Sequence, residues 1–170
     1  PGVVPAGSRS DQVINQDYIF PTVLDLTGME DLKIADSAGR SFVPTMRGED
    51  QAGLDAAYFE YITERAVATR EWKYVKRMFG DPPELYHLLT DPGEYANLAA
   101  DPMYAEVVDE LDENLSRFFD RYSTAEYDDW NGGSAKALLM YNDKNEQFES
   151  TFPGFQPPTI EKAVPFRGNR

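Results

Sequence analysis

Residues 65–88 read RAVATREWKYVKRMFGDPPELYHL. β-Branched and aromatic residues alternate there with charged ones and are interrupted by short turns, a pattern typical of strands. The turn at Arg70-Glu71 is too short for a crossover, so the strands on either side of it run antiparallel. With AYFEY just upstream, the pattern predicts four strands, at 57–61, 66–69, 72–78 and 84–88.

A long amphipathic helix is expected after the fourth strand. Asp101 is its N-cap and Pro102 its first helical residue. Apolar residues then recur at helical spacing from Tyr104 to Tyr122, with acidic residues mostly on the other face. Such a helix must bury its apolar stripe, and the four strands are the available surface. The fold class expected for 56–122 is therefore α+β, a four-stranded antiparallel sheet packed by one long helix.

The flanking segments differ in character. Residues 1–11 are rich in Gly, Pro and Ser and predict a loop or linker. Residues 17–28 predict a short, mostly buried helix, with Asp17 as N-cap and Gly28 at its end. Residues 123–170 combine prolines with phenylalanines, so we expect an extended tail anchored to its own body or to a neighbouring subunit. Because the chain opens with Pro-Gly, we expect it to be part of a longer protein.

Composition excludes several classes of function. The chain has 170 residues, enough for one domain with a core, and no cysteine, so it contains no disulfide, thiolate metal site or cysteine nucleophile. A net charge of −14 disfavours nucleic acid as a partner, and no apolar run is long enough to span a membrane. Residues 65–79 hold five basic side chains and one acidic. This basic ribbon is either a set of charges on an outer face or an attractor of anionic substrate.

Common catalytic motifs are missing from the sequence. There is no glycine-rich phosphate loop, no His-Glu-x-x-His and no Gly-x-Ser-x-Gly. His87, the single histidine, falls in a strand and is interpreted as a strand surface residue. Residues 128–133 (DDWNGG) lack the first carboxylate of a calcium loop and predict an Asx-rich turn. The residues alone define an α+β domain without an assigned activity.

Four segments with recognisable patterns follow one another along the chain. They are Asn15–Gly28 (NQDYIFPTVLDLTG), Gly39–Pro44 (GRSFVP) with Gly48, Tyr58–Tyr61 with Arg65–Val75, and Glu84–Leu88 with Asp91–Glu94 and Asn97–Ala99. In this order they resemble the C-terminal third of a formylglycine-type sulfatase of the alkaline-phosphatase-like superfamily. The similar family patterns are D-x-x-P-T-hydrophobic-L-D-L-x-G, G-R-S-L-x-P-x-x-x-G, R-A-V-R-T-x-x-Y-K-Y-I and E-L-Y-D-L-x-x-D-P-x-E-x-x-N-L-A. The resemblance leaves residues 123–170 uncovered.

The sequence departs from the family pattern at three positions. His87 stands where the family usually has Asp, Ala68 where it often has Arg, and Trp72 where it often has Tyr. The resemblance also implies a domain organisation. Residues 1–55 would be the end of the large α/β domain, 56–122 the C-terminal sheet and helix, and 123–170 an extended tail rich in aromatic residues and proline.

The resemblance implies a sulfatase that hydrolyses sulfate esters on a sulfated carbohydrate. The family's formylglycine nucleophile comes from a Cys/Ser-x-Pro-x-Arg motif, and its calcium ion is held by Asp and Asn residues mostly in the N-terminal two-thirds. Residues Ser41–Pro44 do not have the motif's spacing. We therefore expect no catalytic or metal-binding residue in this chain, which would be inactive without a partner, the missing N-terminal catalytic domain.

The expected contribution of this chain is to shape the substrate pocket. Candidate substrate-binding residues are Thr63, Glu64 and Arg65 between two strands, and Trp130 and Asn131 at the start of the tail. Arg65 could pair with a second sulfate or a carboxylate, and Trp130 could stack on a sugar face. The alternatives are a strand-end salt bridge for Arg65 and a core or interface aromatic for Trp130.

Two other functions stay open. One is hydrolysis of phosphonate or phosphate monoesters by the same superfamily. The other is a non-catalytic binding or oligomerisation module, a homo-oligomer through the tail being one form. A sulfatase fragment would leave Phe20, Val23 and Leu24 exposed, so the free chain should aggregate or bind a hydrophobic dye. By resemblance alone, the expected compartment is periplasmic or secreted.

Overall fold

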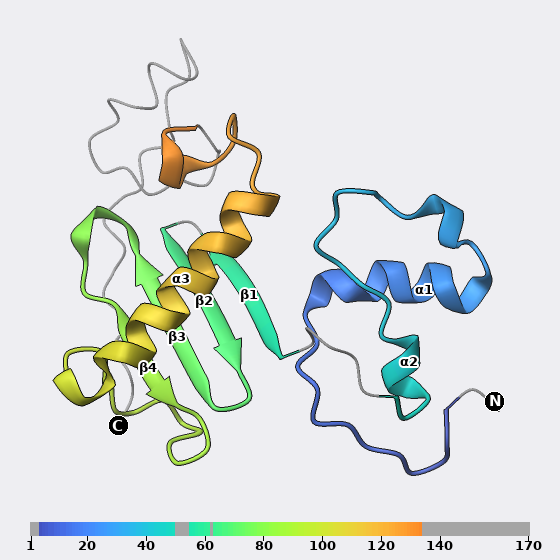
Figure 1. The fold of residues 1–170 in the computed structure, drawn as a ribbon, viewed down its shortest axis with the longest axis horizontal. Coiled ribbons are helices and arrows are strands. Elements are labelled where there is room, and N and C mark those ends of the chain that lie inside the picture. Colours follow the sequence, from blue (N-terminus) through green and yellow to red (C-terminus); the bar gives the residue numbers. More distant parts are fainter. Residues whose placement is uncertain (1–3, 50–54, 62, 134–170) are drawn as a thin grey trace, which may run out of the picture. The chain divides into compact units, whose positions relative to one another are not determined.

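The computed structural model describes residues 4–49, 55–61 and 63–133. The chain divides into two compact units, Pro1–Thr124 and Ala125–Arg170, and each is considered by itself. The first unit contains the sheet, its helix and the segment that precedes them (Figure 1). From residue 134 onward, the predicted tail lies outside the residues that the structure describes.

The first unit contains a four-stranded antiparallel sheet in the order β1-β2-β3-β4. Thr69 forms the tight turn between β2 and β3, because its Oγ1 accepts hydrogen bonds from the backbone N–H of Glu71 (3.2 Å) and of Trp72 (2.9 Å). The predicted sheet is thus confirmed, with ends that differ from the prediction by two residues or fewer. The strands are β1 Ala56–Tyr61, β2 Glu64–Thr69, β3 Trp72–Arg77 and β4 Glu84–His87.

Helix α3 (Ala105–Tyr122) lies across one face of this sheet, as Figure 1 shows. The carboxylate of Asp101 accepts a hydrogen bond from Met103 N (2.9 Å) and caps a 3₁₀ turn, Pro102–Tyr104, that leads into the helix. Both the cap and the packing partner agree with the prediction. The buried core between helix and sheet consists of Val67, Tyr74, Leu85, Leu111, Leu115 and Phe119.

The segment before the sheet is built around helix α1 (Ile19–Thr27), which ends as predicted at Gly28 in the left-handed conformation (φ 71°). The predicted cap at Asp17 is wrong. Asn15 caps instead, because its side chain accepts from Gln16 N (3.0 Å) at the start of a 3₁₀ turn, Gln16–Tyr18, which contains Asp17. This turn continues directly into α1.

The described residues between α1 and β1 contain two short elements. One is the 3₁₀ turn Glu30–Leu32, and the other is the one-turn helix α2 (Val43–Met46). Helix α2 carries Pro44 in its first turn, where a missing N–H costs least. In the second unit, the described residues form a 3₁₀ turn, Asp129–Asn131.

Candidate functional site

The hairpin end between β1 and β2 contains three of the five predicted substrate-binding residues. Glu64 and Arg65 are consecutive in β2, so their side chains lie on opposite faces of the sheet. Arg65 faces α3 and is 6% exposed, with its guanidinium carbon 4.0 Å from the ring centroid of Phe119. Its Nη2 donates to Ser123 Oγ (3.3 Å) and pairs with Glu60 (3.5 Å). These contacts hold the end of the sheet against the helix.

On the face of the sheet that points away from α3, charged side chains at this hairpin end form a small network of ion pairs. Arg77 on β3 pairs with Glu64 and, at 2.7 Å, with Glu84. Burial alone would raise the pKa of the Glu84 carboxyl, but hydrogen bonds from Arg77 and Tyr86 outweigh burial and lower it. Thr63 contributes its carbonyl, which accepts from Met78 N (2.9 Å). The loop between the strands is therefore fastened to β3.

Ion pairs neutralise the whole basic ribbon of residues 65–79. Each of its five cations has a carboxylate partner within 4.0 Å. The sequence offered two interpretations, charges on an outer face or an attractor of anions. The pairing disfavours the attractor, but Arg65 and Lys76 lie on the face that α3 covers and not on the outer face. The pairs are Arg65–Glu60, Arg70–Asp11, Lys73–Glu94, Lys76–Asp112 and Arg77 with Glu64 and Glu84.

The first two sequence motifs hold one another in place. Thr22 Oγ1 donates to the Tyr18 carbonyl (2.6 Å) and accepts from Phe42 N (3.0 Å). Ser41 Oγ donates to the Asp25 carboxylate (2.5 Å), which ties the Gly-Arg-Ser segment to α1. Gly39 lies so close to the Asp17 carbonyl that a Cβ would collide with it. The motif residues therefore build the local structure.

The fourth motif has the same structural role at the other end of the sheet. The Asn97 side chain accepts from Leu85 N (3.0 Å) and donates to the Pro83 carbonyl (3.1 Å), so it extends β4 into the following loop. Asp91 Oδ2 accepts from Ala96 N (2.9 Å), and such backbone N–H groups lower the pKa of the Asp91 carboxyl. The loop after β4 is thereby fixed.

Helix α1 presents a wide apolar face, so the prediction of a mostly buried helix is wrong. Phe20 is 54% exposed and Val23 49% exposed, as predicted. The expected exposure of Leu24 is wrong, since it is 5% exposed and lies beside Phe20 at the edge of the buried side of the helix. The other large apolar side chains exposed on α1 and just after it are Ile19, Leu26, Met29, Leu32 and Ile34. Such a patch marks an interaction surface.

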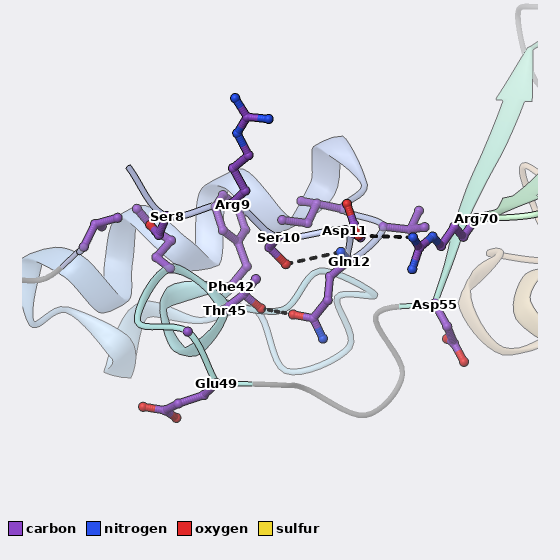
Figure 2. A pocket seen from close by; sticks show the side chains of 15 residues that line it. Ser8, Arg9, Ser10, Asp11, Gln12, Phe42, Thr45, Glu49, Asp55 and Arg70 are labelled. Carbon is purple, nitrogen blue, oxygen red and sulfur yellow. Dashed lines mark hydrogen bonds and ion pairs between the residues drawn. The ribbon is translucent and has the colours of Figure 1, made fainter. Parts of the chain in front are cut away.

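A cavity of about 660 Å³ lies between the N-terminal segment and the residues around α2 (Figure 2). One side is formed by residues 8–14, where Gln12 receives a hydrogen bond from Thr45 of α2. Asp11 pairs with Arg70 at 3.1 Å, while Arg9 extends away from that pair. The sequence predicts a loop or linker at residues 1–11 and gives no sign of this cavity, because the walls of the cavity meet only in the folded chain.

The other two predicted residues lie in the second unit. Asp128 is buried and caps their turn, since Oδ1 accepts from Trp130 N (3.0 Å) and Oδ2 from Asn131 Nδ2 (2.9 Å). Gly133 N closes the turn on the Asp128 carbonyl (2.8 Å). This geometry is an Asx-rich turn, as the sequence indicated. A substrate contact by Trp130 and Asn131, as by Thr63, Glu64 and Arg65, remains a prediction.

The calcium ion of sulfatases does not fit the described part of this chain. Within residues 4–49, 55–61 and 63–133, no three His, Asp or Glu side chains are grouped closely enough to hold a metal ion. We therefore derive no step through a metal from these residues. In the same ranges, no helix is both long and apolar enough to cross a membrane.

The fold and the ordered motifs define a class, the C-terminal subdomain of sulfatases in the alkaline-phosphatase-like superfamily. The sequence model of the family "N-sulphoglucosamine sulphohydrolase, C-terminal" matches residues 1–121. The chain belongs to this family. The resemblance stated from the sequence is thereby confirmed, as is the α+β fold with its antiparallel sheet and long helix.

Three proteins similar to this chain differ in the activity that their names state. A Delta 4,5-hexuronate-2-O-sulfatase from Bacteroides thetaiotaomicron is 33% identical over 75% of this chain and 29% of its own length. The structure of a 2-O GAG sulfatase is 29% identical, with a TM-score of 0.56 over 69% of this chain and 27% of that one. The structure of a phosphonate monoester hydrolase of Agrobacterium radiobacter is 30% identical, with a TM-score of 0.50. The match covers 62% of this chain and 24% of that one. The chain spans 20–30% of the length of the curated relatives it matches.

Proposed function

We propose that this chain is the C-terminal part of a sulfatase that hydrolyses sulfate esters on a sulfated carbohydrate. The observation that carries the proposal is the family match over residues 1–121. Two of the similar proteins are named as sulfatases of a hexuronate and of a GAG, which supports a carbohydrate substrate. The nucleophile would lie in another part of the protein, so the 170 residues alone would be inactive.

The exposed face of α1 would be where the large catalytic domain packs. Burying Phe20, Val23 and their neighbours would remove apolar surface from water, a favourable change of about 25 cal/mol per Å². The Thr22, Asp25 and Ser41 contacts fix α1 and the Gly-Arg-Ser segment as one block. A preformed block of this kind would join the larger domain without further ordering.

Substrate positioning would be the chemical role of this chain. Arg65 would act by holding the hairpin end against Phe119 and Ser123, which would present Thr63 and Glu64 to the substrate. Trp130 and Asn131 would contribute a further contact from the second unit. Formylglycine and calcium, supplied by the rest of the protein, would provide the nucleophile and charge neutralisation at sulfur.

An activity assay of the complete gene product tests the proposal. We expect release of p-nitrophenol from p-nitrophenyl sulfate and release of sulfate from a 2-O-sulfated unsaturated disaccharide. The 170-residue chain, purified in the same way, should show neither activity. Absence of both from a folded complete product would contradict the proposal, as would full activity of the 170-residue chain.

The second candidate function is hydrolysis of phosphonate monoesters. The 30% identity to the phosphonate monoester hydrolase favours it, and p-nitrophenyl phenylphosphonate in the same assay separates the two. A rate constant kcat/KM higher for the phosphonate than for the sulfate would replace the first proposal with the second. A binding or oligomerisation module would hydrolyse neither substrate.

We also propose a periplasmic or secreted location, because sulfated polysaccharides are found outside the cytoplasm. Fractionation of the producing cells, with immunodetection of the chain, checks this. Recovery in the cytoplasmic fraction alone would contradict it.

A further inference from the structure

A second concavity lies where β3 and β4 meet the segment before α3. Its volume is about 350 Å³, the size of a small ligand site. Three ring side chains and two polar side chains from separate parts of the chain converge on it. Its lining includes Trp72, His87, Thr90, Asp91, Leu98 and Tyr104.

The three rings form one continuous surface. Trp72 and His87 are neighbours across β3 and β4, with ring centroids 4.5 Å apart and planes at 78°. Tyr104 is the second ring beside Trp72, with ring centroids 5.6 Å apart and planes at 59°. Rings this close leave no space between them for a quaternary ammonium, which an aromatic cage would need. They offer instead an apolar corner on which a flat ligand face can pack.

The polar groups beside the rings are fixed. Thr90 N donates to His87 Nδ1 (3.2 Å), which also lies 2.6 Å from Thr90 Oγ1, and His87 Nε2 lies 3.1 Å from Glu71 Oε1. The Asp91 carboxylate is held by the backbone N–H of Ala96, and its lowered pKa keeps it ionised. The described lining contains this carboxylate and no lysine or arginine. Such a site accepts hydroxyl donors and repels sulfates and carboxylates.

We propose that this concavity binds one neutral pyranose unit of a polysaccharide. The apolar face of the sugar stacks on Trp72, with Tyr104 at its border, and its hydroxyls donate to the Asp91 carboxylate and to Thr90 Oγ1. The proposal goes beyond the sulfatase function, because the site selects uncharged sugar units and uses none of the predicted substrate-binding residues.

Tryptophan indole NMR tests the proposal on the 170-residue chain. The chain has two tryptophans, so the two indole N–H signals can be assigned with Trp130→Phe. We expect cellohexaose or xylohexaose to shift the Trp72 signal in a saturable way and to leave the Trp130 signal unchanged. No shift with either neutral hexasaccharide would overturn the proposal. So would a response confined to choline chloride or to a heparin-derived sulfated hexasaccharide.

Matched variants separate binding from folding. Trp72→Leu should weaken hexasaccharide binding by about tenfold or more, whereas Trp130→Phe should leave Kd unchanged. Because Trp72 also packs against the core, Thr90→Val provides a milder variant, expected to weaken binding about threefold with an unchanged circular dichroism spectrum. If folded Trp72→Leu bound the hexasaccharide as tightly as the wild type, the proposed site would be wrong. It would also be wrong if Trp130→Phe lost as much affinity as Trp72→Leu.

Discussion

Two regions of the molecule differ in how far they bury their large apolar side chains. One is the sheet with α3, and the other is the segment around α1. Between α3 and the sheet, Leu85 and Val67 are completely buried and Leu115 is 1% exposed. On α1, four large apolar side chains remain about half exposed. The first region closes its own core, whereas the second presents an apolar face that only a further layer can cover. A part of a larger enzyme would have this combination.

The largest effect is expected from opening the closed core. Leu115→Ala removes a fully buried side chain from α3 and should lower the free energy of unfolding by roughly 2–5 kcal/mol. Urea denaturation followed by circular dichroism measures it. The matched control is Leu26→Ala on α1, at 48% exposure, which should cost under about 1 kcal/mol. Equal losses in the two variants would remove the contrast between the regions.

A smaller effect is expected at Arg65, which joins the hairpin end to the helix. Arg65→Met keeps much of the packing on Phe119 but loses the contacts with Glu60 and Ser123, so we expect a loss of about 1–3 kcal/mol in urea denaturation. Arg77→Met removes the ion pairs on the other face, which are partly exposed and should contribute about 1 kcal/mol or less. If Arg65→Met left the free energy of unfolding unchanged, the contacts of Arg65 would not stabilise the fold. A role in substrate binding alone would then be the better account of Arg65.

The pH dependence of stability tests the contact between α3 and β3. Burial and the hydrogen bond from Tyr74 to Asp112 (2.9 Å) raise the pKa of Tyr74 above its ordinary value of 10. The unfolded state therefore loses this proton first, so stability is retained below pH 10 and falls as pH rises beyond it. Urea midpoints at pH 8 to 11 should decline less steeply in Tyr74→Phe. Parallel declines in both proteins would show that Tyr74 contributes nothing there.

The smallest effect on stability is expected on the exposed face of α1. Phe20→Ser with Val23→Ser should change the free energy of unfolding by about 0.5 kcal/mol per residue or less, because both side chains are half exposed. The same double variant should reduce binding of a hydrophobic dye by the free chain. A severely destabilised variant, or unchanged dye binding, would show that this face is not the accessible apolar surface.

The sequence predicted the sheet and α3 well because their signals are local. Alternation over the strands, Thr69 at the turn and Asp101 before Pro102 each act within a few residues. The two wrong predictions at α1 concern the burial of Leu24 and the identity of the capping residue. Both depend on contacts between residues that are distant in the sequence. Leu24 is 5% exposed although it follows the exposed Phe20 by one turn, and Asn15, which also donates to the Tyr58 carbonyl (3.0 Å), replaces Asp17 as cap.

The candidate sites depended even more on tertiary structure. Strand alternation alone separates Glu64 from Arg65, but the position of Arg65 over Phe119 required the packing of α3. The ring surface of Trp72 and His87 required the register of β3 and β4. The departures at these two positions were visible in the sequence, and only the fold brings them into one concavity.

Hydrogen–deuterium exchange, compared between the 170-residue chain and the complete gene product, tests the contrast between the two regions most directly. Amides of β2 and β3 should be protected equally in both, because their core is closed within the chain. Amides of α1 should exchange rapidly in the chain alone and become at least tenfold slower in the complete product, where the catalytic domain would cover Phe20 and Val23. Equal exchange of α1 in the two proteins would contradict the assignment of this face to a larger sulfatase domain.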